Sequence, residues 1–297
     1  TFGEIKKASH ATLQQYEENP YPRWHKYPFQ QSFKKFNDFL LTQELNPKNF
    51  VSLDNDKKEI LIAGCGTGLN VFKVAAGFPG SNITAVDLSI SSLAYAKRKV
   101  EEAGLQGISF YHADISQMSE IKNTYHYIEC MGVLHHNEDY LQIWRSLTQC
   151  LKKNGVMRVG LYSRRARKEI IQFRDTLDKN FVGISQDQVI YERQKIIDNN
   201  KNFNFTASID FFSKSGFRDL ILNAYEKQFD LLEIKEILKE LNLQFLGIQM
   251  KNTTARFEFK KLFPKNDDWF ILDNWDSLEK KFPHLFVGMY QFWCQKN

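Results

Sequence analysis

Three alternating glycines, Gly64, Gly66 and Gly68, stand between a short apolar run and a stretch with helical periodicity. Glycine lets backbone N–H groups approach a ligand closely, and a helix that follows presents unpaired N–H groups in its first turn. A dinucleotide-binding turn has the spacing GxGxxG, but Leu69 occupies the position of its third glycine. The Gly-Lys-Ser/Thr end of a P-loop does not follow either. The turn therefore predicts a ligand site without the fingerprint for a pyrophosphate.

Two aspartates follow the next two predicted strands and offer hydrogen-bond acceptors to the same site. Asp87 stands roughly 20 residues beyond Gly68, where a carboxylate can accept both hydroxyls of a ribose. Asp114 ends the next strand and can accept from an exocyclic amine such as that of adenine. Together they indicate an adenosine that carries no phosphate chain. The alternatives are a helix cap at Asp87 and a solvated loop position at Asp114.

Two neighbouring histidines, His135 and His136, follow the fourth predicted strand. A neutral histidine beside the reacting atoms can accept a proton from a hydroxyl or an amine, so His136 is a candidate catalytic residue. The alternative is a loop histidine that is hydrogen-bonded to the backbone. We expect no metal site from this pair and Asp139, because neighbouring residues rarely point at one ion.

Alternating strands and helices must position these residues. Short apolar runs that end in these polar or glycine residues are typical of strands buried on both faces, and helical periodicity separates them. The alternation predicts βαβ units and a parallel sheet, whose ligand site lies at the carboxyl ends of the strands. We expect strands over residues 59–63, 83–86, 108–112, 125–131, 156–161, 243–250 and 287–294, and a helix over 138–153.

The ordered set of motifs resembles a class I S-adenosylmethionine-dependent methyltransferase. The resemblance covers residues 59–162 and is carried by Ile60 to Gly68, Asp87, Asp114 and Gly132-Val133-Leu134-His135-His136. It implies an α/β fold with a Rossmann-like, doubly wound, seven-stranded sheet whose last strand is antiparallel, and S-adenosyl-L-methionine as the cofactor. The cofactor-binding residues that it implies are Gly64, Cys65, Gly66, Thr67, Gly68, Asp87, Leu88, Asp114, Ile115 and Met131.

The chain departs from this family at one position. Many members place an acidic residue, which helps to hold the amino group of the cofactor, where this chain has Ile62. The segments 15–24 and 288–293 resemble a narrower group, the bacterial methyltransferases found with upstream tetratricopeptide repeats. The anchor for the methionine end of the cofactor therefore stays open.

The first 58 residues lack the strand rhythm, and three prolines make residues 20–28 stiff and extended. One hypothesis is a helical and proline-rich lid over the ligand end, with Tyr16 and Tyr21 beside the cofactor and Arg23 on its carboxylate. The alternative is a clamp packed on the outside of the domain. We expect the methyltransferase domain over 59–297, with a helical insertion over 164–228 after strand five.

Composition limits the class of protein. Of 297 residues, 42% are hydrophobic and 25% charged, as in ordinary globular proteins, and no run approaches the ~18 apolar residues of a membrane span. A net charge of +5 is too small to indicate nucleic acid as a partner. Four scattered cysteines predict a reduced, cytoplasmic protein. The chain begins at Thr1, so a missing upstream segment or domain stays open.

The expected function is transfer of a methyl group by in-line displacement to an acceptor that the sequence does not name. A protein side chain, a small metabolite and a lipid-linked glycan all stay open, as does the oligomeric state. One alternative is a non-catalytic, regulatory S-adenosylmethionine-binding module, and another is a different transfer from the same cofactor. The basic run Arg164, Arg165, Arg167 and Lys168 indicates either an anionic acceptor or a solvated helix face.

Overall fold

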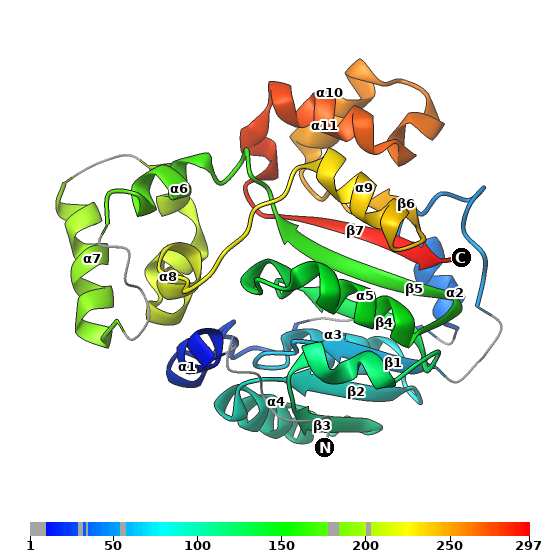
Figure 1. Ribbon diagram of the computed structural model, residues 1–297, viewed down its shortest axis with the longest axis horizontal. Helices are drawn as coiled ribbons and strands as arrows, with labels where there is room; N and C mark the ends of the chain where they lie inside the picture. Colours follow the sequence, from blue (N-terminus) through cyan, green and yellow to red (C-terminus); the bar gives the residue numbers. More distant parts are fainter. Residues whose placement is uncertain (1–9, 29–31, 34, 54–57, 178–183, 200–202) are drawn as a thin grey trace.

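Figure 1 shows the computed structural model, which describes residues 10–28, 32–33, 35–53, 58–177, 184–199 and 203–297. Within these residues one sheet has the strand order β3-β2-β1-β4-β5-β7-β6. Neighbours from β3 to β5 pair in parallel, and β7 pairs antiparallel with both β5 and β6. The strands are β1 (Glu59–Ala63), β2 (Asn82–Asp87), β3 (Ile108–His112), β4 (Tyr125–Met131), β5 (Leu151–Tyr162), β6 (Leu243–Ile248) and β7 (Met289–Lys296). The predicted fold class is confirmed, including the antiparallel last strand.

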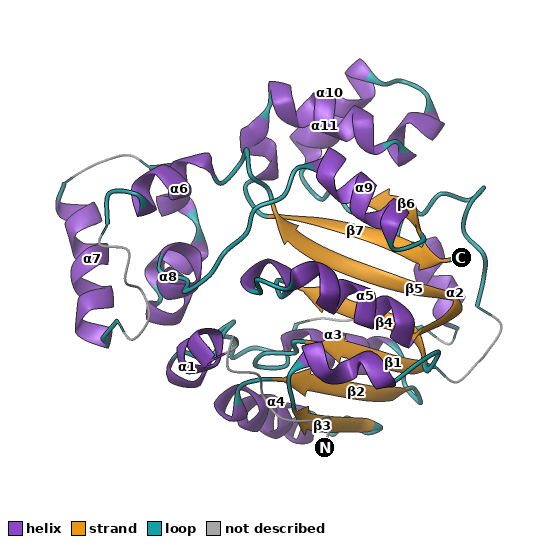
Figure 2. Cartoon of the chain, in the orientation of Figure 1, coloured by secondary structure: helices purple, strands orange, loops and turns teal. Residues whose placement is uncertain are grey.

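Helices cover both faces of this sheet (Figure 2). On one face, α2 (Phe36–Leu41), α3 (Leu69–Gly77) and α4 (Ile90–Glu102) share a buried cluster with the strands. On the other face, α5 (Tyr140–Cys150), α9 (Leu231–Glu240), α10 (Thr253–Leu262) and α11 (Leu272–Lys281) do the same. The central strands β1 and β4 are buried along almost their whole length. This explains the apolar run of β1, whereas β4 also buries His126 and Glu129.

One predicted boundary is wrong. Helical periodicity predicts a helix to residue 153, but α5 ends at Cys150 and β5 starts at Leu151. Leu151 pairs with Tyr125 on β4, ahead of a register shift in the same strand pair. Pairing with the sheet therefore overrides a local helical pattern over these residues.

Three helices that follow β5 form a separate group beyond its carboxyl end. These are α6 (Lys168–Arg174), α7 (Gln186–Asp198) and α8 (Lys214–Ile221), and they enclose an apolar cluster of their own that includes Phe205, Phe211 and Phe217. The N-terminal helix α1 (His10–Glu18) lies beside α8 (Figure 1), where the Tyr16 hydroxyl donates to the Asp219 carboxylate at 2.7 Å. The helices α6, α7 and α8, which we call the α8 group, therefore face the edge of the sheet at which β1, β2 and β4 end, and α1 faces the same edge.

The basic run after β5 is neutralised within the chain. Arg164 pairs with Asp230 and Glu233, and the guanidinium of Arg165 reaches Asp276 and Glu279 at 2.7 and 2.8 Å. Arg167 pairs with Glu226. The arginines are therefore neither a purely solvated face nor an open anion site. Arg164 and Arg165 join the segment after β5 to α9 and α11, and Arg167 joins it to Glu226, which follows α8.

The buried pair Arg167–Glu226 gives a stability prediction. Its side chains are 2% and 0% exposed, and Arg174 also lies 3.7 Å from the Glu226 carboxylate. Glu226→Gln leaves a guanidinium without its counter-charge, which should cost about 3–5 kcal/mol in the free energy of unfolding. Urea unfolding measures this change. Asp273→Asn, which breaks an exposed pair with Lys235, is the control and should cost at most about 1 kcal/mol, and equal effects of the two variants would contradict the assignment.

Candidate active site

A cavity of about 380 Å³ opens at the edge of the sheet where β1, β2 and β4 end. This volume lies within the range of small-molecule sites in proteins, roughly 300–1,000 Å³. The structure brings most of the predicted site residues together in its wall: Tyr16, Tyr21, Gly64, Cys65, Gly66, Asp87, Leu88, Ile115, Met131 and His136. Thr67, Gly68, Asp114 and Arg23 do not line it.

The glycine turn is shaped by close protein neighbours. Gly66 has φ +51°, and a Cβ there would lie 2.6 Å from the carbonyl oxygen of Tyr21. Gly68 has φ +84°, and its Cβ would lie 2.6 Å from the Cβ of Ala96 on α4. Both glycines are thus needed for backbone conformation and for packing. From the sequence, these glycines are interpreted as a ligand-binding turn, with a purely structural turn as the alternative, and the cavity wall contains only the first two of them.

Asp87 ties the end of β2 to this turn. One carboxylate oxygen accepts from the backbone N–H of Gly66 at 2.7 Å, and the other accepts from the N–H of Ser89 at 2.9 Å. Burial raises the pKa of Asp87, although these two N–H groups oppose the shift. The N-cap of α4 is Ser89, whose hydroxyl accepts from Ser92 N–H, so Asp87 is not the cap itself. Each carboxylate oxygen keeps acceptor capacity toward the cavity.

Asp114 lies behind the wall of the cavity. Its carboxylate accepts from Ser116 N–H at 2.8 Å and caps the 3₁₀ turn Ile115–Glu120. The residue is 1% exposed, so it is not a solvated loop position. Its neighbours Ala113 and Ile115 line the cavity. A contact between Asp114 and an adenine stays a prediction.

The proline-rich segment lies directly on the glycine turn. Thr67 donates through its backbone N–H to the Tyr21 carbonyl at 3.3 Å and through its hydroxyl to the Pro22 carbonyl at 2.5 Å. The indole N–H of Trp24 donates back to the Thr67 carbonyl at 3.0 Å. This two-way bonding holds the segment against the turn, and Tyr16, Tyr21 and Pro22 reach the cavity.

Arg23 does not share this position. Its side chain is exposed, and its Nε donates to His25 Nε2 at 3.1 Å. The structure therefore does not bring Arg23 to the place where it would meet a carboxylate in the cavity.

His136 is held at both ring nitrogens. Nδ1 lies 2.9 Å from the Tyr225 carbonyl, which can only accept, so this nitrogen carries the hydrogen. Nε2 lies 3.5 Å from the side-chain amide of Asn223. The side chain lines the cavity and is also bonded to backbone, so features of both readings of this residue are present.

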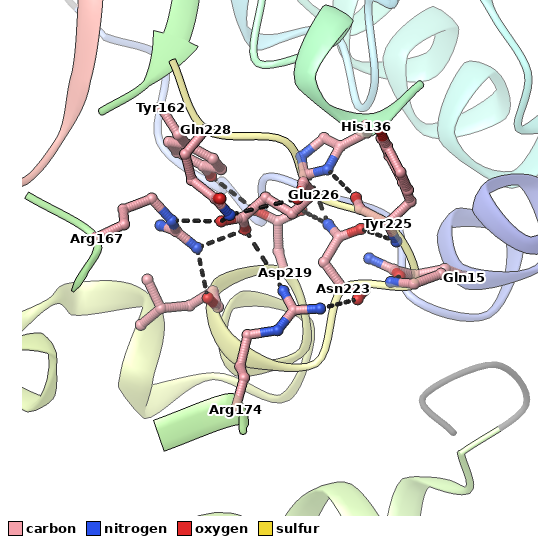
Figure 3. A network of polar contacts seen from close by, with 12 residues as sticks. Gln15, His136, Tyr162, Arg167, Arg174, Asp219, Asn223, Tyr225, Glu226 and Gln228 are labelled. Carbon is pink, nitrogen blue, oxygen red and sulfur yellow. Dashed lines mark hydrogen bonds and ion pairs between the residues drawn. The ribbon is translucent and has the colours of Figure 1, made fainter. Parts of the chain in front are cut away.

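The sequence pattern misses the acidic part of the cavity. Asp219, on α8, is 4% exposed and accepts from the hydroxyls of Tyr16 at 2.7 Å and Tyr162 at 3.4 Å. Burial raises its pKa. Figure 3 shows Asp219, from α8, and Asn223, from the loop that follows this helix, close to Tyr162 and His136. The sequence does carry a signal for Tyr162, because this residue directly follows the fifth predicted strand. No local pattern distinguishes Asp219 from the other acidic residues of the insertion.

A basic part of the cavity is missed as well. Lys73 and Arg158 line it, and burial lowers the pKa of Lys73. The Arg158 guanidinium donates to Gln249 and Gln291 at 2.7 Å each, and it lies 3.6 Å from Glu129. Glu129 is the register neighbour of Ile62 on β4, so an acidic side chain stands on the adjacent strand.

Comparison with known proteins gives a family match for part of the chain. Residues 60–155, which are less than half of the chain, match a family model described as a methyltransferase domain. The region that matches contains the glycine turn, Asp87 and His136.

The relatives of the chain are distant. The chain is 26% identical over 234 residues to an uncharacterized protein of Synechococcus sp., which covers 75% of this chain and 55% of the relative. It is 31% identical over 105 residues to a ubiquinone biosynthesis O-methyltransferase of Actinobacillus pleuropneumoniae, which covers 34% and 44% of the two chains. The chain spans about half the length of the curated relatives it matches. The methyl acceptors of these relatives are therefore not assigned to this chain.

A solved structure has the same fold. PKMT2 from Rickettsia typhi, in complex with AdoHcy, matches with a TM-score of 0.65 at 16% identity, over 94% of this chain and 55% of that chain. At this identity the likeness shows the fold alone. Within the described residues no helix combines the length and the apolar character needed to cross a membrane.

The buried carboxyl group of Asp219 gives a pH-dependent prediction. Its raised pKa in the folded domain favours the neutral form, so its stabilising contribution is fully present below the unfolded pKa of about 3.9 and is lost as the pH rises through the folded pKa. Asp219→Asn, which cannot ionise, should therefore be more stable than the parent chain near pH 8, and the difference should shrink toward pH 4. Tyr16, Tyr162, His136, Arg167 and Glu226 surround this group and stay unchanged in the variant.

Urea unfolding between about pH 4 and about pH 8 measures this difference. Asp187→Asn removes an exposed carboxylate from α7 and serves as the control, with no such trend expected. A stability difference for Asp219→Asn that is independent of pH would contradict the burial of a charge at this position.

Proposed function

We propose that this chain is an S-adenosylmethionine-dependent methyltransferase whose cofactor lies between the glycine turn and the N-terminal segment. The observation that supports this most strongly is the Asp87 carboxylate, which is bonded to the glycine turn and still borders the cavity. Its remaining acceptor capacity suits the two hydroxyls of a ribose. Leu88 and Ile115 are apolar neighbours in the wall that would flank the adenine.

The methionine end would point toward the basic part of the cavity. Lys73 and Arg158 offer hydrogen-bond donors to a carboxylate. Glu129 lies 3.6 Å from Arg158, and it is the neighbour on β4 of Ile62 on β1. We assign the carboxylate contact to Lys73 and Arg158 in place of Arg23. This assignment supplies an anchor at the end of the site where the family's usual acidic residue is missing.

The chain's own residues would promote the reaction mainly by placement. When bound, S-adenosylmethionine supplies a methyl group on a sulfonium leaving group. Tyr16, Tyr21 and Pro22 border the cavity from the N-terminal side and would keep water from the reacting atoms. Holding the acceptor in line with the methyl group reduces the barrier through proximity and alignment. The N-terminal segment is therefore assigned the role of a lid, and α8 and its neighbours the acceptor side.

Two further assignments depend on the sequence. The segments 15–24 and 288–293 support placing the chain with the bacterial methyltransferases found with upstream tetratricopeptide repeats. All four cysteines are free and buried, which supports a reduced compartment such as the cytoplasm.

Asp87→Ala tests the cofactor site. The variant removes the acceptor for two ribose hydroxyls, and hydrogen bonds to a charged group contribute ~1.5–3 kcal/mol, so affinity for S-adenosylhomocysteine should fall roughly 10- to 100-fold. Calorimetric titration measures the affinity, with Asp187→Ala on α7 as the control for an exposed aspartate. Unchanged affinity in Asp87→Ala would remove the ribose assignment.

Catalysis is separated from binding by turnover. A methyltransferase should convert S-adenosylmethionine to S-adenosylhomocysteine when a fractionated cell extract is added, with a product heavier by one methylene. A non-catalytic regulatory module should bind S-adenosylhomocysteine and show no conversion with any fraction. Mass spectrometry of the products also distinguishes methyl transfer from another transfer from the same cofactor.

A further inference from the structure

The acidic part of the cavity combines aromatic rings with a buried carboxylate. Tyr16 and Tyr162 border the cavity and bond to Asp219 through their hydroxyls, and Tyr21 borders the cavity as well. The three rings come from α1, the segment that follows it, and the end of β5, whereas Asp219 comes from α8. The N-terminal segment, the sheet and the α8 group thus all contribute to one compartment.

No ion pair joins Asp219 to a described Lys, Arg or His, although His136 and Arg167 lie close enough to oppose the rise in its pKa. Its hydrogen-bond donors are the two tyrosine hydroxyls and the side-chain amide of Asn223 at 3.4 Å, all of them neutral. Arg167 lies nearby, but Figure 3 shows its guanidinium turned to Glu226, which accepts two hydrogen bonds from it at 2.7 and 2.6 Å. The charge of Arg167 is therefore already matched.

A second carboxylate increases the negative character of this compartment. Asp210 is half-buried and accepts from the hydroxyl of Tyr21. Asp210 and Asp219 are close enough that the charge of Asp219 contributes to a raised pKa of Asp210. Asp210 does not line the cavity, so an anionic acceptor would meet the carboxylate of Asp219 there. A cation would offset the cost of burying Asp219. It could lie against the ring of Tyr16 or Tyr21, because the Tyr162 ring is already in contact with Arg167 and His135.

We propose that the methyl acceptor is a primary alkylamine, which enters as an ammonium ion and donates to the Asp219 carboxylate. This inference rests on the proposed function. The ammonium group transfers a proton to a carboxylate oxygen of Asp219, and the freed nitrogen lone pair attacks the methyl carbon. The carbon–sulfur bond breaks, its electron pair stays on sulfur, and the products are a methylammonium group, a neutral thioether and protonated Asp219.

The acceptor class explains the position of His136. Its Nδ1–H is used by the Tyr225 carbonyl, and its Nε2 faces the Asn223 amide that also donates to Asp219. His136 and Asn223 thus orient the carboxylate, and Asp219 takes the proton. In this arrangement His136 is a positioning residue.

Binding of small probes tests the acceptor class without knowledge of the natural substrate. The protein is saturated with S-adenosylhomocysteine, and n-butylamine, n-butanol and butyrate are titrated at neutral pH with detection by ligand-observed NMR. Butylammonium should bind at least 10-fold more tightly than the other two. Asp219→Asn should weaken it roughly 10- to 100-fold, since a charge-assisted hydrogen bond is lost. Asp187→Asn should leave it unchanged.

The outcomes separate the inference from the proposed function. If S-adenosylhomocysteine itself does not bind, the proposed function fails. If it binds and butanol or butyrate binds as tightly as butylammonium, the amine assignment is overturned, and the parent chain alone decides this even if Asp219→Asn does not fold. Folded Asp219→Asn that keeps full affinity for butylammonium would also overturn the role of Asp219. Methylation of butylamine by the parent chain, with the loss of this activity in Asp219→Asn at unchanged affinity for S-adenosylhomocysteine, would support both steps.

Discussion

The backbone of Gly66 is the point on which the site depends. Its N–H donates to the Asp87 carboxylate at 2.7 Å, and its α-carbon lies so close to Tyr21 that a side chain would meet the Tyr21 carbonyl at 2.6 Å. Gly66, in the turn after β1, thus contacts both the end of β2 and the N-terminal segment, and it has no side chain that would separate them. In the proposed function, a cofactor bound at Asp87 would share this turn with Tyr21, which would link cofactor binding to the position of the N-terminal segment.

The charged side chains of the cavity lie in two separate regions, one basic and one acidic. Lys73 and Arg158 form a basic region that can hold an anionic group, and Asp219 belongs to an acidic, tyrosine-lined region. Burial disfavours charge in both, since it lowers the pKa of Lys73 and raises that of Asp219. Groups kept in such an environment reduce the stability of the unliganded domain, and charges of the opposite sign on the cofactor and acceptor would recover part of that cost.

Much of the fold could be predicted from the sequence because a doubly wound sheet has a strong local pattern. A strand such as β1 is buried on both faces and has a short apolar run. The glycine turn, Asp87 and His136 lie at or just beyond the ends of β1, β2 and β4. The cavity wall contains most of the residues predicted for it. The boundary at Leu151 was predicted incorrectly because strand pairing with Tyr125 overrides helical periodicity there.

The remaining parts of the site depend on contacts between distant segments, for which a single sequence carries no periodic signal. Asp219 becomes part of the cavity only because α8 packs beside α1, about 200 residues away in the chain. Arg23 lies in a segment that does reach the site, but its own side chain turns outward to His25. The arginines after β5 were open to two readings, and their acidic partners lie far along the chain, at Glu226, Asp230 and Glu279.

A crystal structure of the chain with S-adenosylhomocysteine tests the central claim most directly. We expect both ribose hydroxyls within hydrogen-bond distance of the Asp87 carboxylate and Tyr21 beside the nucleoside. The sulfur atom should face the compartment of Tyr16, Tyr162 and Asp219. A ligand that lies outside this cavity, or one whose ribose hydroxyls are bound by other residues while Asp87 contacts only Gly66 and Ser89, would contradict this claim.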